Sequence, residues 1–421
     1  MKPEIGLLSN GLRVVTQNMP HLETSSLGVW VGVGSRHETG TQHGLSHLLE
    51  HMAFKGTSRR SAQGIAEEIE AVGGDLNAAT SVETTAYYAR VLKGDEGLAL
   101  EILADILLDS TFAAPDLERE REVILQEIAA IEDSPDELVY DLVHDAAYPG
   151  QAAGRPIIGT PHSVKHLSAS DLRLFLASHY HPGNMVIAAA GAVRHEPFLR
   201  HVEALFGGLS RGQPGADETA RYTGGLRSSA KPFEQSHLMI GFEGPSYTQD
   251  DYITAQVLSG LLGGGMSSRL FQEVREKRGL CYSIYSSAWG LRDSGMFAVH
   301  AATGVDMMEG LIDVVRAELA RVASEGVTAP ETARSKAQLK AGLLMSLESS
   351  SSIAETMARQ MLVHGRIVPG EELVAKVNAV TSEQLRTFAA RLVTAPPSVA
   401  VAGAGRRSRE FAERAGRSQT H

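Results

Sequence analysis

The 421-residue chain is poor in cysteine, and Cys281 is its only one. It therefore has no internal disulfide, and a reducing compartment is expected. No apolar run approaches the roughly 20 residues that cross a membrane. Residues 1–6 show neither the apolar core of a signal peptide nor an arginine-rich transit segment. These absences favour a bacterial cytoplasmic protein without a membrane span.

Positive charge is also scarce: 39 Lys and Arg stand against 50 Asp and Glu, for a formal net charge of −11. This balance argues against binding to nucleic acid, whose phosphates attract basic surfaces, and weakly favours cationic partners. The 43% hydrophobic and 21% charged content is ordinary for a globular protein. At this length, two domains are expected rather than a single core.

The most informative motif is H-L-L-E-H at residues 47–51. The leucines and methionine around it recur at helical spacing, which predicts a helix ending near Gly56. Histidines four positions apart share a helix face, so His47 and His51 can bind one metal ion, and Glu50 is placed to take a proton from water there. Such a set is typical of a hydrolytic zinc site. By itself, the motif also fits a surface helix with incidental histidines.

A third ligand is expected, because zinc hydrolases usually have three protein ligands and an open fourth position. In residues 114–128, Pro115 and Asp116 form a typical helix start, and the stretch carries Glu120 and Glu127. Residues seven apart differ by only about 20° around a helix axis. Both carboxylates can therefore face one site, one binding metal and the other orienting a ligand. The alternating charges of this stretch are also typical of a solvated helix.

Together, the H-x-x-E-H and E-x6-E elements resemble the pitrilysin (inverzincin) family of zinc metallopeptidases. Within it, the chain is similar to the mitochondrial processing peptidase catalytic subunit and its bacterial relatives, from about residue 7 to about residue 405. The resemblance implies that His47, His51 and Glu127, which lies 76 positions after His51, bind one zinc ion. It also implies that Glu50 is the general base and that Glu120 is the carboxylate that orients a ligand.

An internal repeat indicates two homologous domains. The sequence SASDLRLF at residues 168–175 recurs as TSEQLRTF at 381–388, and each copy precedes an apolar strand that ends in glycine. A similar offset aligns residues 26–32 with residues 236–242. Similar offsets at three places favour duplication over chance. In this register Val257 and Leu261 stand opposite the two histidines of the motif, so the second half lacks the metal site.

The predicted fold class is α+β, with two homologous domains that are each a mainly antiparallel sheet covered by helices. The resemblance adds that such a chain is half of a clam-shell. We predict a catalytic zinc-binding domain over residues 1–206, a glycine-rich linker over 207–225, and a second domain over 226–421 that carries the substrate element described below.

A β-rich stretch follows Gly73-Gly74. If it lies at a sheet edge, an extended peptide can add to it as a further strand. The resemblance places the start of this strand beside the zinc, which makes Asn77 and Ala78 candidate substrate-binding residues. The stretch also fits an ordinary sheet strand.

In the second half, Arg275 and Tyr282 match the R-x6-Y element of the family. A cation and a phenol together can hold the scissile carbonyl and its developing negative charge. Arg278 is a competing candidate, and a charged helix end followed by a core tyrosine is the alternative interpretation.

Glu137 and Asp141 are four positions apart and share a face if this stretch is helical. They match the acidic pair with which the processing peptidase binds an arginine just upstream of the cut. Carboxylate pairs on helices are usually solvated, which is the alternative.

These features predict a zinc endopeptidase with one Zn²⁺ per chain, acting on extended, unstructured, preferably basic peptides. The resemblance implies a homodimeric chamber with shared active sites. Two alternatives remain open: a non-catalytic structural subunit, and a peptide-binding chaperone of the same fold.

Overall fold

The computed structural model describes residues 2–212 and 218–417. Residues 213–217 of the predicted linker lie outside the described residues. No described helix combines the length and the apolar character needed to cross a membrane. The chain forms two compact units, each drawn from three stretches of sequence. Unit 1 comprises the described residues of Met1–Ile128, Pro156–Glu218 and Met345–Val368, and unit 2 those of Ala129–Arg155, Thr219–Leu344 and Pro369–His421.

The two units differ at two places from the predicted domains, which are continuous stretches of the chain on either side of the linker. Residues 129–155 belong to unit 2 although they precede the predicted linker, and residues 345–368 belong to unit 1 although they follow it. The physical reason is that a hydrophobic pattern reveals the apolar face of a helix, whereas it does not reveal which sheet that face covers.

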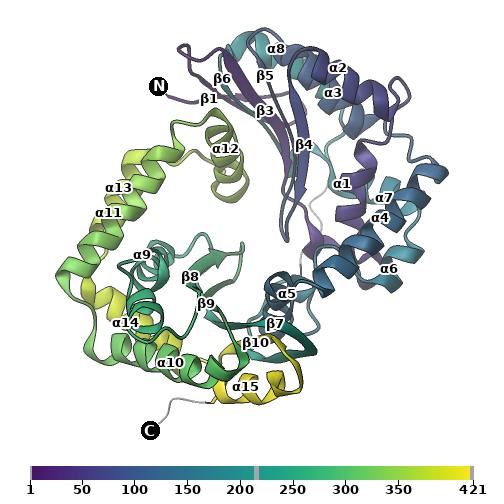
Figure 1. Ribbon diagram of the computed structural model, residues 1–421. Helices are drawn as coiled ribbons and strands as arrows, with labels where there is room; N and C mark the ends of the chain where they lie inside the picture. The colour runs from purple at the N-terminus through teal and green to yellow at the C-terminus, as the bar shows by residue number, and fades with distance from the viewer. Residues whose placement is uncertain (1, 213–217, 418–421) are drawn as a thin grey trace. The chain divides into compact units, whose positions relative to one another are not determined.

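Unit 1 is built on a six-stranded sheet (Figure 1). Its strands are β1 (Glu4–Leu7), β2 (Arg13–Asn18), β3 (Thr24–Val31), β4 (Asp75–Thr80), β5 (Thr85–Leu92) and β6 (Met185–Gly191). They lie in the order β1-β2-β6-β3-β5-β4, and every neighbouring pair except β2–β6 is antiparallel. The apolar strand β6 is buried along its whole length, as expected for a central strand covered on both faces.

The helices of unit 1 are α1 (Leu45–Ala53), α2 (Ala62–Ala71), α3 (Glu96–Leu108), α4 (Ala114–Glu132, in unit 1 up to Ile128), α6 (Pro161–His166), α7 (Ala169–His179), α8 (His195–Phe206) and α12 (Ser350–His364). Of these, α1, α2, α3, α8 and α12 lie against strands of the sheet. Near the C-terminal end of the chain, α12 lies against β2, β3 and β6 (Figure 1). Its side chains Ile353, Met357 and Met361 form an apolar core with Trp30 and Val186.

Unit 2 is built on a four-stranded sheet in the order β10-β7-β9-β8. Its strands are β7 (Gly225–Glu243), β8 (Ser283–Gly290), β9 (Gly295–Thr303) and β10 (Ser398–Ala404). Both halves of the long strand β7 pair with β10, because Val399 lies opposite Leu226 in the first half and opposite Ile240 in the second.

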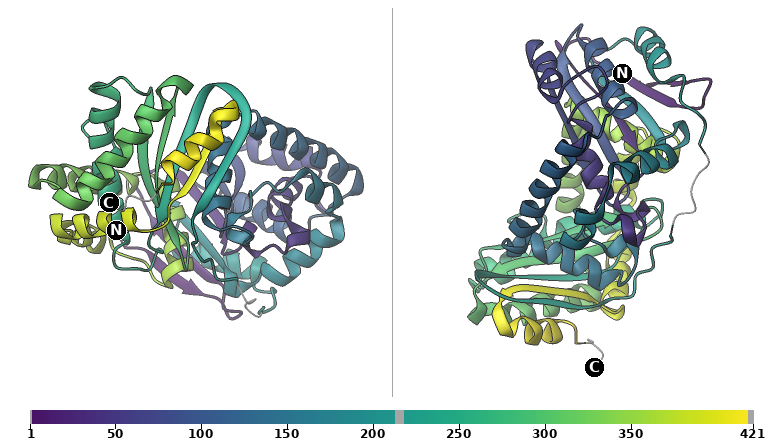
Figure 2. Two further views of the ribbon diagram at one scale, coloured as in Figure 1. Left: turned by 90° about the horizontal axis from the view of Figure 1, so that it is seen from below. Right: turned by 90° about the vertical axis from the view of Figure 1, so that its right-hand side faces the viewer.

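The helices of unit 2 pack around this sheet. They are α5 (Pro135–Ala147), α9 (Tyr252–Gly263), the π-helical segment η5 (Phe271–Glu276), α10 (Met308–Glu325), α11 (Ala329–Ser346), α13 (Gly370–Ala379), α14 (Ser382–Thr394) and α15 (Ser408–Ala415). The helix α15, drawn in yellow in Figure 2, packs on β7 and β10. Short 3₁₀ turns lie at η1 (Ser35–His37), η2 (Gly40–Gln42), η3 (Ala152–Gly154), η4 (Pro182–Asn184), η6 (Val305–Met307) and η7 (Gly405–Arg407).

The two sheets repeat one strand order. In unit 1, β6 lies between β2, to which it is parallel, and β3, to which it is antiparallel. In unit 2, β10 lies between the two halves of β7, and the register gives the same two directions. The strands β5 and β4 extend the first sheet as β9 and β8 extend the second. The predicted fold class is therefore confirmed: the chain is α+β, with two related units, each a mainly antiparallel sheet covered by helices.

Candidate metal centre

The helix α1 carries the H-L-L-E-H motif, and residues before the motif fix where the helix begins. Gly44 has a φ of 91°, which favours glycine, and a Cβ there would lie 2.8 Å from the carbonyl oxygen of Ile158. The buried carboxylate of Glu38 accepts hydrogen bonds from the backbone N–H groups of Gly44 (2.8 Å) and Ser46 (2.6 Å). A helix leaves such N–H groups without internal partners, so Glu38 holds the start of α1 in place.

The two histidines of the motif lie one turn apart on α1. Their ring centroids are 4.7 Å apart, and each side chain is 17% exposed. Burial, and then the neighbouring His51, lowers the pKa of His47 to about 4. His47 is therefore neutral at pH 7 and keeps a nitrogen lone pair for a metal ion.

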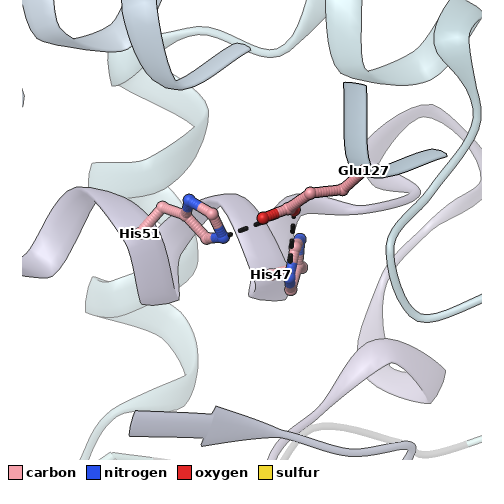
Figure 3. A group of neighbouring side chains, drawn as sticks. All are labelled: His47, His51 and Glu127. Carbon is pink, nitrogen blue, oxygen red and sulfur yellow. Dashed lines mark ion pairs between the residues drawn. The ribbon is translucent and has the colours of Figure 1, made fainter. Parts of the chain in front are cut away.

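Glu127, on α4, points at both histidines (Figure 3). Its Oε2 lies 3.9 Å from His47 Nε2 and 3.7 Å from His51 Nε2, too far for hydrogen bonds. The same oxygen is buried without a hydrogen-bond partner. Leaving a buried carboxylate oxygen unpaired is costly, and a cation between the three side chains would satisfy it.

The residues present fit a zinc ion. One ligand atom from each of His47, His51 and Glu127 lies within 4.8 Å of the other two, and within the described part of the chain no other His, Cys, Asp or Glu side chains form such a group. Zinc binds imidazole nitrogen and carboxylate oxygen at about 2.0–2.2 Å, which sets tetrahedral ligands about 3.3–3.5 Å apart. The two observed N–O separations are only slightly longer than this.

Glu120, seven positions before Glu127 on α4, supports the second histidine. Its Oε2 accepts a hydrogen bond from His51 Nδ1 at 3.0 Å, and its Oε1 lies 2.8 Å from Lys55 Nζ. Burial opposes ionisation of Glu120, but the hydrogen bonds from Lys55 and His51 outweigh it and hold the pKa of this carboxyl below its ordinary value. A carboxylate only accepts hydrogen bonds, so His51 carries its proton on Nδ1 and presents the Nε2 lone pair to Glu127.

Glu50 lies between the two histidines in sequence and is partly exposed. It has no hydrogen-bond or ion-pair partner among the described residues. Burial, then Tyr180, then the charge of Glu50 raises the pKa of Tyr87 well above its ordinary value, which places the Glu50 carboxylate close to that buried ring. The carboxylate is thus unoccupied by other side chains and free to accept a proton.

The strand β4 lies at the edge of the unit 1 sheet, and within the described residues it pairs only with β5. Asn77 is exposed and Ala78 is buried, opposite Tyr88 and Tyr87 respectively. Asn77 Oδ1 accepts a hydrogen bond from the N–H of Ala78 at 2.8 Å. An edge of this kind can accept another extended chain, and the two tyrosines behave as ordinary members of the neighbouring strand.

In unit 2, Arg275 lies in the π-helical segment η5, a rare conformation that often occurs at functional sites. Its guanidinium carbon lies 4.7 Å from the ring centroid of Phe271 and 5.3 Å from that of Tyr282, which is 76% exposed. Arg278 instead donates hydrogen bonds of 2.6 and 2.7 Å to the carbonyl and carboxylate of Glu273. Of the two arginines, Arg278 is held by a carboxylate, whereas Arg275 has no carboxylate partner among the described residues.

Glu137 and Asp141 both lie on α5, and the structure places the two carboxylates near each other. Burial, and then the negative charge of Glu137, raises the pKa of Asp141 to about 6. The pair forms a concentration of negative charge in which Asp141 is partly buried and Glu137 is exposed.

The structure brings the three predicted ligands and the predicted orienting carboxylate together in unit 1. The arginine–tyrosine pair and the acidic pair form two separate groups in unit 2. Sequence reasoning missed Glu38 and Lys55. Lys55 lies four positions after His51, so its closeness to the motif was an available signal. Glu38 gave no such signal, because only the folded loop brings it back to the start of the helix.

Two protein-family models match the chain. The model described as "Insulinase (Peptidase family M16)" matches residues 13–161, and the one described as "Peptidase M16 inactive domain" matches residues 166–339. The uncharacterized zinc protease YmxG of Bacillus subtilis is 39% identical over 386 residues, which cover 91% of this chain and 94% of that protein. An uncharacterized zinc protease of Streptomyces coelicolor is 39% identical over 405 residues, covering 94% of this chain and 88% of that protein.

Solved structures share the fold. A crystal structure described as a peptidase M16 inactive domain, from Pseudomonas fluorescens, has a TM-score of 0.88 at 22% identity and covers 96% of this chain and 98% of that one. A protease from Helicobacter pylori has a TM-score of 0.87 at 23% identity, with coverages of 95% and 99%. Relatives named as zinc proteases span nearly the whole chain, and the predicted resemblance is thereby confirmed. The chain belongs to the M16 peptidase family.

Proposed function

We propose that the protein is a zinc-dependent endopeptidase that cleaves extended, unstructured and preferably basic peptides. The observation that carries this proposal is the group formed by His47, His51 and Glu127, with the unengaged carboxylate of Glu50 on the same helix. The names of the full-length relatives support zinc as the metal.

A bound zinc ion supplies Lewis acidity, which lowers the pKa of water towards about 7 and polarises a carbonyl oxygen. The chain supplies the rest of the chemistry. Glu50 accepts a proton from the attacking water and passes it to the leaving amine, as a general base and then a general acid. Glu120 keeps His51 in the tautomer that binds metal, through the 3.0 Å hydrogen bond at Nδ1.

Substrate binding is assigned to three elements. The edge of β4, with Asn77 and Ala78, is supported as a peptide site by its position at the end of the sheet. Arg275 and Tyr282 are proposed to hold the scissile carbonyl and its developing negative charge. Within the part of the chain that the structure describes, Arg275 has no carboxylate partner, which supports this role over one for Arg278.

A preference for basic peptides is supported by Glu137 and Asp141 on α5. Two nearby carboxylates can accept the paired N–H groups of an arginine side chain. The formal net charge of −11 also favours basic peptides over acidic ones.

The proposal includes one zinc ion per chain and a homodimer whose two chains complete each other's sites. In this arrangement, the arginine and tyrosine of one chain act with the zinc group of its partner. The family resemblance supports the dimer, and mixing two inactive variants tests it.

The decisive experiment compares the wild type with Glu50→Gln, after the zinc content of each has been measured. The substrate is a quenched, unstructured peptide that contains arginine. We expect one zinc per chain in both proteins and a loss of turnover of about 10²–10⁴-fold in the variant, because the proton acceptor is gone while the ligands remain. Glu122→Gln, at an exposed position on α4, is the matched control and should behave as the wild type.

Other results would favour other functions or another mechanism. Zinc binding without turnover by the wild type would favour a structural subunit, whereas stable capture of the uncut peptide would favour a chaperone. Equal turnover by the Glu50 variant would remove Glu50 from the mechanism.

A further inference from the structure

Lys55 is the first residue past the cap of α1, and it reaches a carboxylate on another helix. Its Nζ lies 2.8 Å from Oε1 of Glu120. The side chain of Glu120 is only 10% exposed, whereas that of Lys55 is 33% exposed. An ion pair at the surface contributes little because water screens it, but here one partner is withdrawn from water, so the attraction is less screened.

The contacts form a directed chain from Lys55 to the metal ligands. An ammonium group only donates hydrogen bonds and a carboxylate only accepts them, so Glu120 accepts from Lys55 at Oε1 and from His51 Nδ1 at Oε2. With Oε1 engaged, the carboxylate cannot rotate without breaking both contacts. The His51 ring is thereby fixed with Nε2 towards Glu127.

Charge balance adds a second argument. Glu120 and Glu127 both bring negative charge next to one histidine. Without the ammonium group of Lys55, the negative charge of Glu120 would repel the Glu127 carboxylate. Glu120 could also turn towards the metal ion and compete with the proposed ligands for it. The ammonium group of Lys55 offsets the charge of Glu120 and occupies the oxygen that would otherwise be available.

We propose that Lys55 is a positioning residue of the zinc site, which acts through Glu120 to hold His51 in its ligand geometry. This inference rests on the proposed zinc function and deepens it. It differs from a purely structural role, in which Lys55 would only attach the end of α1 to α4. A structural role predicts a change in the stability of the metal-free protein, whereas the proposed role predicts a change in zinc affinity that requires Glu120.

The test is a double-mutant cycle on the zinc Kd of the full chain, measured by competition with a fluorescent zinc chelator. The four proteins are the wild type, Lys55→Met, Glu120→Ala and the double variant. We expect Lys55→Met to raise the Kd about tenfold, at the low end of the range for residues that support ligands. In the Glu120→Ala background, the same change should alter the Kd by less than about twofold, because the intermediary is absent.

Two further variants complete the design. Lys55→Arg keeps the charge and the donors and should stay near the wild-type Kd, and Lys55→Gln replaces Lys55→Met if the latter does not fold. Lys93→Met, at an exposed lysine of the same unit, is the control and should have no effect.

The outcomes separate this inference from the function on which it rests. A wild type that binds zinc tightly, together with an unchanged Kd in Lys55→Met, would overturn the role of Lys55 alone. If Lys55→Met changed the zinc Kd equally in the presence and absence of Glu120, the proposed role would also be overturned, because Lys55 would not act through Glu120. A wild type that binds no zinc would overturn both proposals.

Discussion

At the scale of single residues, the site depends on which atoms already have partners. Glu127 Oε2 is buried without one, and Glu120 has both oxygens engaged. Two carboxylates on one helix, seven positions apart, thus have different surroundings, and this is why we propose different roles for them. The same reasoning favours Arg275 over Arg278 as a substrate-binding residue, because Arg278 donates a hydrogen bond to the carboxylate of Glu273.

Asp141 gives a prediction about pH. Its pKa of about 6 means that lowering the pH from 7 to 5 neutralises most of the carboxylate, and its attraction for a substrate arginine is lost. We expect kcat/KM for an arginine peptide, divided by that for the same peptide with citrulline, to fall up to about tenfold over this range. In Asp141→Asn the ratio should be low and independent of pH.

The control for this measurement is Asp145→Asn, on the same helix at a carboxylate that pairs with Arg227. It should retain the wild-type pH dependence. A wild-type ratio that does not change between pH 7 and pH 5 would contradict the proposed role of Asp141.

The sequence predicts much of the site at this scale, for a physical reason. Residues four or seven apart on a helix must share a face, so the ligand motif and the pair of glutamates could be recognised without a structure. Lys55 is close to the motif in sequence, but its contact with Glu120 could not be predicted, and neither could the role of Glu38, because no periodicity encodes a contact between segments.

At the scale of elements, the position of α1 matters more than its stability as an isolated helix. This helix has only nine residues, and helices this short are marginal by themselves. Buried side chains along one face and the carboxylate of Glu38 at its N-terminus hold it in the fold. Negative charge also interacts favourably with the positive end of the helix dipole.

Replacing that carboxylate should therefore loosen the helix. We expect Glu38→Gln to lower the free energy of unfolding of the metal-free protein by about 1–3 kcal/mol, because the amide keeps one neutral acceptor oxygen and leaves one of the two buried N–H groups without an acceptor. Zinc affinity should fall as well, since α1 carries two of the proposed ligands. Urea titration followed by zinc competition measures both quantities.

The comparison variant is Glu67→Gln, at an exposed position on α2, which should leave both quantities unchanged. Wild-type stability in Glu38→Gln would mean that packing alone positions α1.

A second element, α11, is held at its start by Glu331. The hydrogen bonds from Arg269, and then those from the N–H and hydroxyl of Thr328, lower the pKa of Glu331 to about 2, although burial opposes this. A depressed pKa in the folded state stabilises the protein above the unfolded value of about 4.5, and this contribution is lost as the pH falls from about 4.5 towards 2.

We therefore expect Glu331→Gln to cost about 2 kcal/mol of stability at pH 7, after allowance for partial solvent screening. The difference from the wild type should shrink as the pH falls below about 4.5. Denaturant titrations of both proteins at pH 7, 5 and 3 measure it, with Glu371→Gln, at an exposed site on α13, as the reference. A difference that grows in acid would show that the sign of this argument is wrong.

Most elements could be expected from the sequence, since period and turn residues mark where helices and strands begin and end. The repeat predicted two related sheets, and the matching strand orders bear this out. The position of α12 could not be expected, because its apolar face suits either sheet. Its partner is decided by packing against Trp30 and the strands beside it.

At the scale of the whole molecule, the proposed dimer makes a prediction about mixtures. If each active site takes its zinc group from one chain and Arg275 from the other, inactive Glu50→Gln and inactive Arg275→Ala chains should complement each other. Random exchange into closed dimers should restore up to about a quarter of the wild-type activity.

The measurement mixes the two variants, verifies subunit exchange with distinguishable tags, and then follows peptide cleavage. A mixture of Glu50→Gln with itself under two tags is the control and should stay inactive. No recovery after verified exchange would show that each chain works with its own residues or that the site is not shared.

The docking of α12 on the sheet of unit 1 has a consequence for how the protein is made. All the proposed zinc ligands have been synthesised once residue 127 is in place, but α12 ends only at His364. At about 5–20 residues per second, roughly 10–50 seconds of translation separate the two events. Once β6 has also been made, a nascent chain thus carries all the proposed ligands and the whole sheet, but the apolar face that α12 covers is still open. Unit 1 is therefore complete only after residue 364 has been synthesised, and a chain terminated before that point would lack the helix that covers its sheet.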